Sequence, residues 1–343
     1  MTPAEASRKG YWKNWFNDPT PRDEQGHGAK DSPRCGKTAL PMKPNHVETI
    51  VAIADAGTIR GAALVLHKSQ PAVSNALKNA EDGIGARIFL REPTGMVPTE
   101  IGHEIIARSR TILNELRRLE EQVRQLQGEL VGSIRLIVSP LAAIKITPQS
   151  IIAFKRKYPK VSVNIDSGQS PSAFVQLRRG DADLVIAPAP ATPSEEIGLV
   201  CEHLFSDPLL FITGAGSKFA DVESVPELNA AQWLMFGPKE REPIIQGYLS
   251  KLGFELENPM TCSDSVLSVM GLLAISDMVC TCPQSLFDQL KGTWDVVQVP
   301  FEVELAPVNM AVITSSTRPP TSVVMAFKEV VLKEAKSAPQ FTQ

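Results

Sequence analysis

A long stretch without proline, residues 100–127, limits most strongly how this chain can fold. Hydrophobic residues recur along it every seven positions, and a second set follows four positions after the first. The two sets are Ile105, Ile112, Leu119 and Leu126, and Ser109, Leu116 and Val123. This heptad pattern predicts one continuous α-helix with a narrow seam for a partner helix. At 1.5 Å per residue the helix would be about 42 Å long, which is too long for a lone surface helix. We therefore expect a dimerising linker helix at residues 101–128, with a core helix of the next domain as the alternative.

Three short helical patterns precede this stretch, between residues 45 and 83. The third begins at Ser69, a residue type that favours the N-cap, and carries Pro71 in its first turn, where proline is tolerated. Residues 87–99 then have the pattern of a small β-hairpin. Three short helices followed by a hairpin predict an all-α winged helix-turn-helix domain at residues 43–100.

Strand patterns alternate with helix patterns over residues 133–335, which predicts an α/β domain with parallel sheets and right-handed crossovers. The strands are too many for one small sheet, so we expect two lobes. Lobe I would comprise about 133–205 and 315–335, and lobe II about 206–314. The expected strands are 134–139, 161–166, 182–187, 209–213, 232–236, 260–262, 278–282 and 308–314. The expected helices are 148–158, 171–180, 241–252, 264–274, 284–291 and 321–335.

Composition excludes some classes of protein. The formal net charge of −3 argues against a protein that coats nucleic acid by charge alone, although a local basic surface is still compatible with it. No stretch approaches the roughly 20 apolar residues of a membrane span, and the first residues lack a signal-peptide core. We therefore expect a cytoplasmic protein that contacts no membrane. Residues 1–42 have no sustained period and are expected to be disordered. The five cysteines, few and widely spaced, are expected to be small buried residues.

The predicted third helix carries the sharpest functional signal. In a helix-turn-helix unit the second helix of the motif places its first residues against base edges in the major groove. Gln70, Ser74, Asn75 and Lys78 supply groups that can bond to bases and phosphates, whereas Val73, Ala76 and Leu77 should face the core. A solvated helix face without a partner is the alternative interpretation of this pattern taken by itself.

These residues form a motif that resembles the signature of the LysR-type transcriptional regulators. The run A-A-x-x-L-x-x-S-Q-P-A-V-S begins at Ala62 and ends at Ser74. It continues in register as E-x-x-x-G-x-x-I-F-x-R from Glu81 to Arg91, and as T-x-x-G from Thr99 to Gly102. The resemblance extends over about residues 43–335. In the C-terminal part the segments FKRKYPKVSVNI and LRRGDADLVIAP are similar to the corresponding segments of regulators of aromatic acid or sulfonate catabolism.

The resemblance implies a bacterial regulator that binds promoter or operator double-stranded DNA and responds to a small-molecule inducer. It also implies a homotetramer built as a dimer of dimers, and contact with RNA polymerase is compatible with that role. The DNA-binding candidates are Thr58, Lys68, Ser69, Gln70, Pro71, Ser74, Asn75, Lys78 and Arg91, the last being the main cation of the wing. Between residues 43 and 102 acidic and basic side chains balance, so dimers are needed to supply affinity through avidity.

The C-terminal part resembles a type-II periplasmic binding protein with two lobes. Ligands of such doubly wound lobes bind at strand ends and helix N-termini. The effector candidates are Ser139, Pro140, Leu141, Gln169, Ser170, Thr213, Lys239 and Ser263, and together they suggest a cleft for a small anion. For each one, a turn or capping role is the alternative.

Two other classes of protein fit the sequence less well. An enzyme would need a nucleophile and base or a metal cluster, and no G-x-S-x-G, Walker A or H-E-x-x-H motif is present. An exported substrate-binding protein would need a signal peptide and would have no use for a helix-turn-helix. The sequence therefore predicts no catalytic residue, no metal ligand and no cofactor.

Overall fold

The computed structural model describes residues 42–126, 131–256, 258–300, 303 and 305–337. The extension predicted at residues 1–42 lies outside the described residues except for Met42, and so does Cys35. No helix of the described part is long and apolar enough to cross a membrane.

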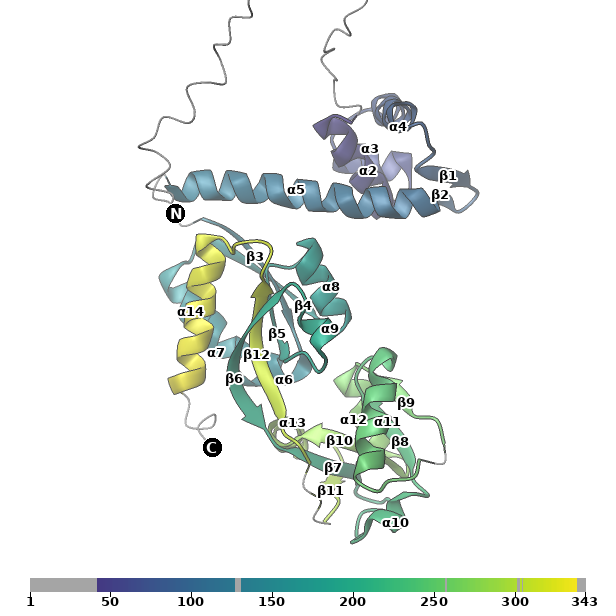
Figure 1. The fold of residues 1–343 in the computed structure, drawn as a ribbon, viewed down its shortest axis with the longest axis vertical. Coiled ribbons are helices and arrows are strands. Elements are labelled where there is room, and N and C mark those ends of the chain that lie inside the picture. The colour runs from purple at the N-terminus through teal and green to yellow at the C-terminus, as the bar shows by residue number, and fades with distance from the viewer. Residues whose placement is uncertain (1–41, 127–130, 257, 301–302, 304, 338–343) are drawn as a thin grey trace, which may run out of the picture. The chain divides into compact units, whose positions relative to one another are not determined.

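The N-terminal part forms the predicted winged helix-turn-helix (Figure 1). Its elements are α2 (Pro44–Ala56), α3 (Ile59–Val65), α4 (Gln70–Ile84), β1 (Phe89–Glu92) and β2 (Gly95–Pro98). Ser69 is the N-cap of α4, as predicted, and its hydroxyl oxygen accepts a hydrogen bond from the Ala72 amide at 3.3 Å. Gly85 ends α4 with a φ of 77°, a left-handed conformation that glycine adopts without strain. The three helices pack around a core that includes Ile50, Ile53 and Val73, all fully buried.

A buried carboxylate joins the end of α4 to the hairpin. Glu81 accepts hydrogen bonds from the backbone amides of Ile88 at 2.8 Å and Phe89 at 3.3 Å. Gly102 then brings the following helix against the same strand, because a Cβ at this position would overlap the Ile88 carbonyl oxygen. The Thr99 hydroxyl accepts from the Gly102 amide at 2.9 Å and so caps that helix. These contacts give the E-x-x-x-G-x-x-I-F and T-x-x-G motifs a structural reason.

The proline-free stretch is one helix, α5 (Glu100–Leu126), as predicted. The first turns of α5 pack on the helix-turn-helix core, where Ile106 and Ser109 are buried and Arg110 pairs with Asp55 at 2.5 Å. These turns therefore belong to the core of the preceding domain rather than to that of the next one, and Ser109 is not part of an exposed seam. Farther along, four large apolar side chains of the heptad are 43–57% exposed, namely Ile112, Leu116, Leu119 and Val123.

Two five-stranded sheets follow. The first has the order β4-β3-β5-β12-β6, and the second has the order β11-β7-β10-β8-β9. The first sheet consists of β3 (Gly132–Val138), β4 (Val161–Ser167), β5 (Leu184–Pro188), β6 (Leu199–Asp207) and β12 (Val308–Ser315). The second consists of β7 (Leu209–Gly214), β8 (Gln232–Phe236), β9 (Thr261–Ser263), β10 (Met278–Pro283) and β11 (Val296–Gln298). We call the units built on these sheets lobe I and lobe II.

Helices flank both sheets (Figure 1). Lobe I carries α6 (Pro140–Lys145), α7 (Thr147–Lys157), α8 (Ser172–Arg179), α9 (Pro193–Glu196) and α14 (Ser322–Ser337). Lobe II carries α10 (Val225–Leu228), the 3₁₀ turn η2 (Lys239–Arg241), α11 (Glu242–Lys251), α12 (Val266–Ala274) and α13 (Gln284–Leu290). One apolar core runs through both lobes and includes Phe154, Leu234 and Phe327.

The strand 308–314, expected in lobe II, belongs instead to lobe I. There β12 pairs antiparallel with both β5 and β6. The apolar run predicts a buried strand but carries no information about which sheet it joins. The sheets are also mixed rather than parallel, because β7 in lobe II runs antiparallel to β10 and β11. Strands β6 and β11 and helix α6 were not expected from the sequence.

The cysteines only partly follow the expectation. Cys280 and Cys282 are buried on β10, and burial raises the pKa of the Cys280 thiol to about 12. Cys201 is exposed and Cys262 is half-buried, so the prediction of buried cysteines is wrong for these two.

Candidate DNA-binding surface and effector cleft

All nine DNA-binding candidates lie on the surface of the winged helix-turn-helix, and each has an exposed side chain. On the opposite side of α4, Val73 and Leu77 are buried as predicted, whereas Ala76 is only half-buried. The face that carries Gln70, Ser74 and Lys78 is therefore free of the domain core. A helix with this division offers a row of hydrogen-bonding groups to a partner.

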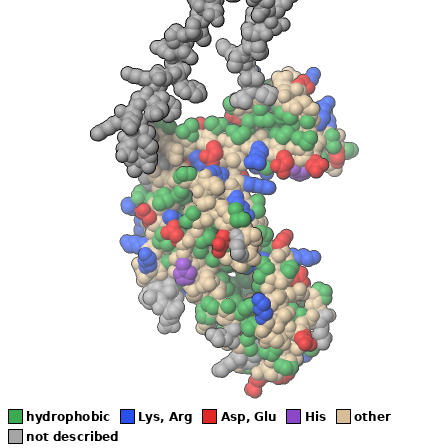
Figure 2. Space-filling view, viewed as in Figure 1, with side chains coloured by type: hydrophobic (Ala, Val, Ile, Leu, Met, Phe, Trp, Pro, Cys, Tyr) green, Lys and Arg blue, Asp and Glu red, His purple; other side chains and the backbone are tan. Residues whose placement is uncertain are grey.

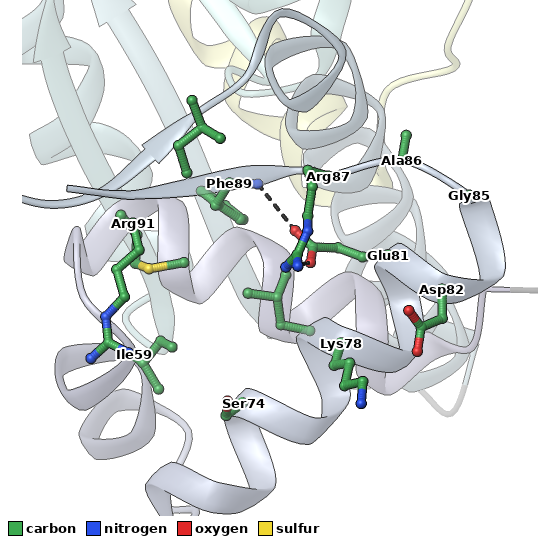
Figure 3. Close-up of a pocket in the computed structure, with 13 residues that line it drawn as sticks. Ile59, Ser74, Lys78, Glu81, Asp82, Gly85, Ala86, Arg87, Phe89 and Arg91 are labelled. Carbon is green, nitrogen blue, oxygen red and sulfur yellow. Dashed lines mark hydrogen bonds and ion pairs between the residues drawn. The ribbon is translucent and has the colours of Figure 1, made fainter.

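An open groove of about 890 Å³ separates α4 from the hairpin. Figure 3 shows Ser74 and Lys78 on its helix side and Arg91 on its strand side. Arg87 also lines the groove, and its side chain is 77% exposed although it pairs with Glu81 at 3.0 Å. Arg87 is not among the candidates predicted from the sequence, although its position just before the wing strand was a signal for it.

Some candidates also have local structural roles. Thr58 caps α3, and its hydroxyl oxygen accepts from the Gly61 amide at 3.0 Å. Lys68 pairs with Glu48 at 3.6 Å, and the two side chains are 39% and 48% exposed. Exposed pairs of this kind are weak and can rearrange when a phosphate approaches.

A buried polar network joins α5 to lobe I, with Asp183 at its centre. The two carboxylate oxygens of Asp183 accept from Arg118 at 2.9 Å and from Arg135 at 2.9 and 3.1 Å. Asn114 accepts from Arg135 at 2.9 Å and donates to Asp181 at 3.2 Å. Five side chains, from α5, from β3 and from the segment before β5, are thus tied together by hydrogen bonds, and those between Asp183 and the two arginines are charge-assisted.

The electrostatics of this network favour the ionised form of its acid. Burial by itself would raise the pKa of Asp183, but the hydrogen bonds and charge of Arg135, together with the charge of Arg118, lower it below the ordinary value. Burial lowers the pKa of the Arg318 guanidinium, which pairs with Glu115 of α5 at 3.6 Å. The joint between α5 and lobe I therefore contains a network of ion pairs.

A cavity of about 130 Å³ lies between the two lobes. Ser139, Pro140, Leu141 and Gln169 line it from lobe I, so half of the eight effector candidates come together there. The hydroxyl oxygen of Ser139 accepts from the Ala142 amide at 3.4 Å, which leaves the hydroxyl proton able to donate. The amide nitrogen of the Gln169 side chain is buried and has no hydrogen-bond partner among the described residues.

The other four candidates do not line this cavity. Thr213 is fully buried and donates to the Met278 carbonyl at 2.8 Å, so it holds two strands of lobe II together. Ser170 is buried and donates to the carboxylate of Glu195. Ser263 accepts from the Ser265 amide at 3.2 Å within a turn, and Lys239 is exposed outside the cavity.

The cation at the cavity is Arg241 of η2, two residues after the predicted Lys239. The sequence predicted a cation in the correct segment. The conformation of the 3₁₀ turn brings Arg241 rather than Lys239 to the cavity. Met235, Phe236 and Ile245 of lobe II also line the cavity and were not expected. Their apolar pattern gave no functional signal because it is equally typical of a core.

Glu195 of α9 lies near this cation but belongs to the other lobe. Burial would raise the pKa of Glu195, yet hydrogen bonds from Ser170 and the Ala191 amide, together with the charge of Arg241, lower it. Attraction between Glu195 and Arg241 therefore acts across the cleft.

Comparison with known protein families and proteins identifies relatives of this chain. Residues 44–103 match the family described as "Bacterial regulatory helix-turn-helix protein, lysR family", and residues 127–336 match the "LysR substrate binding domain". The chain is 27% identical over 232 residues to the HTH-type transcriptional regulator PcaQ of Agrobacterium fabrum, covering 65% of this chain and 73% of that protein. It is 24% identical over 285 residues to the HTH-type transcriptional regulator TdcA of Escherichia coli, covering 81% of this chain and 88% of that protein.

Solved structures share the fold. The crystal structure of CbnR, a LysR family transcriptional regulator, has a TM-score of 0.65 at 18% identity and covers 86% of this chain and 100% of that one. Full-length CbnR complexed with its target DNA has a TM-score of 0.62 at 19% identity, covering 85% and 100% of the two chains. Since the substrate-binding family model alone matches more than half of the sequence, the chain belongs to the LysR family of DNA-binding transcriptional regulators.

Proposed function

We propose that residues 43–100 read operator DNA through α4 and the wing, that α5 dimerises the chain, and that the cleft of residues 133–335 binds a small anionic inducer. In this proposal lobe I includes strand β12. The chain would assemble as a dimer of dimers in the cytoplasm, and RNA polymerase is a further partner that the role allows. CbnR, which shares the fold, forms a complex with its target DNA, and this supports DNA as a partner of this chain.

One observation carries the DNA-binding proposal. Ser74 and Lys78 of the polar face of α4 line one open groove together with the wing cation Arg91, and Gln70 is exposed on the same face of the helix. Gln and Asn pair with adenine edges, and each good base contact is worth about 1–3 kcal/mol of discrimination. Lys78 and Arg91 would contact phosphates and contribute equally on any sequence.

The test is a promoter DNA shift with Gln70→Ala/Ser74→Ala. We expect specific binding to fall by about 2–6 kcal/mol, because two base contacts are lost. The matched control is Ser268→Ala/Gln289→Ala, which removes the same side-chain types from exposed helical positions in lobe II. Unchanged operator affinity in the first variant would remove α4 from the DNA interface.

The dimerisation proposal rests on the exposed apolar residues of α5. Figure 2 shows where hydrophobic side chains gather on one face of the molecule. Leu116→Asp/Leu119→Asp should give monomers, because two charges would enter the seam between paired helices. Sedimentation velocity measures the change, and Gln122→Asp on the same helix is the control. An unaltered oligomer would place the interface elsewhere.

A further inference from the structure

The inter-lobe cavity combines one charge with several hydrogen-bond donors. Arg241 is the charged side chain among its described lining residues, and no carboxylate lines it. The unpartnered amide nitrogen of Gln169 and the hydroxyl of Ser139 add two donors from lobe I. An unpaired buried donor favours a ligand that brings an acceptor. A guanidinium with neighbouring donors suits a carboxylate, which accepts through two oxygens.

The rest of the cavity is apolar and small. Leu141 and Pro188 of lobe I face Met235, Phe236 and Ile245 of lobe II across it. Its volume of about 130 Å³ is close to that of an engineered apolar cavity of about 150 Å³ that binds benzene. The space therefore suits a ligand body of one six-membered ring or an apolar chain of similar volume.

We propose that the effector is a monocarboxylate with a single-ring or similarly sized apolar body, whose carboxylate is bound by Arg241, Gln169 and Ser139. This inference rests on the proposed function of the cleft and adds the ligand class. A second carboxylate would find no second cation in the lining and would lose its hydration among apolar side chains. A neutral amide of the same shape would forgo the ion pair with Arg241. The cleft thus selects by charge number as well as by size.

Isothermal titration calorimetry of the full chain tests this with three compounds that share a benzene ring. Benzoate carries one carboxylate, benzamide carries none and isophthalate carries two. We expect benzoate to bind at least about tenfold more tightly than either. Arg241→Gln should weaken benzoate binding by about tenfold to hundredfold, and Ser139→Ala by a few-fold. Arg156→Gln, an exposed arginine on α7, is the matched control and should leave binding unchanged.

Several results would overturn the inference. The first is that isophthalate or benzamide binds as tightly as benzoate or more tightly. The second is that Arg241→Gln leaves the benzoate affinity unchanged. The third is that neither benzoate nor hexanoate, a monocarboxylate with an apolar chain, binds at millimolar concentration. The promoter shift of the same preparations separates this failure from failure of the proposed function. Wild-type protein that shifts its operator but prefers a dianion keeps the regulator assignment and loses only the ligand class.

Discussion

Lobe I and lobe II have the same sheet topology but different attachments. In each, three neighbouring strands run parallel, a fourth runs antiparallel to them, and a fifth pairs antiparallel with that fourth strand. The fourth strand is β12 in lobe I and β7 in lobe II. Each of these strands directly follows a segment in which the chain passes from one lobe to the other. Equal topology therefore does not distinguish the two lobes; their surfaces do.

Only lobe I has ion pairs to α5 among the described residues, through Arg118, Asp183 and the pair of Glu115 with Arg318. Pairs within lobe II, such as Lys218 with Asp277 at 3.8 Å, are exposed. Lobe I is thus fixed to the linker helix, whereas lobe II supplies the cation of the cleft. A ligand that binds both lobes would change the angle of lobe II relative to a fixed lobe I.

The largest expected effect comes from removing the centre of the lobe I network. Asp183→Ala leaves Arg118 and Arg135 partly buried without their shared carboxylate. We expect the free energy of unfolding, measured by urea denaturation, to fall by about 3–5 kcal/mol. Asp277→Ala in lobe II removes an exposed pair and should cost less than about 1 kcal/mol. Similar costs for the two variants would mean that the lobes are not attached differently.

A second ion pair lies where the lobes meet. Lys145 of α6 donates to Asp207 at 3.3 Å and to Ser285 of α13 at 2.7 Å, and Asp207 is only 1% exposed. Lys145→Met should cost about 2–4 kcal/mol, less than Asp183→Ala because Asp207 still accepts from the Ser285 amide. Lys291→Met, which breaks an exposed pair on α13, is the control in the same denaturation experiment. A cost no larger than that of the control would show that this junction does not depend on charge.

Acid should weaken the lobe I joint. The pKa of Asp183 is lower in the folded chain than in the unfolded chain, so its contribution to stability is complete above pH about 4 and is lost as the pH falls through the folded value. Below pH about 4 the free energy of unfolding should fall more steeply in wild type than in Asp183→Asn, by up to about 1.4 kcal/mol per pH unit. Parallel curves for the two proteins would contradict the lowered pKa.

The smallest effect is expected at the cleft. Glu195→Gln keeps an acceptor for Ser170 but removes the negative charge near Arg241. Benzoate affinity should rise by a few-fold at low salt, and salt should reduce the difference. Stability should change by less than about 1 kcal/mol, because the Glu195 side chain is partly exposed. Weaker benzoate binding in this variant would mean that Glu195 supports Arg241 rather than competing with the ligand for it.

The DNA-binding domain could be predicted closely because its determinants are local. Ser69 and Pro71 start α4, Gly85 ends it, and the spacing of Val73 and Leu77 orients it. The candidate effector cleft could be predicted only in part. Ser139 follows a strand that the sequence shows clearly, but Arg241, Phe236 and Ile245 reach the same cavity from distant segments.

The sequence by itself determined the family motif, the heptad helix and nearly all of the strands, because each depends on side chains a few residues apart. The tertiary structure alone decided that β12 completes lobe I, that Thr213 and Ser170 serve other partners, and that Arg241 rather than Lys239 enters the cleft. Strand partners and cavity walls depend on contacts between segments that are far apart along the chain. The local periodicity of the sequence does not indicate those contacts.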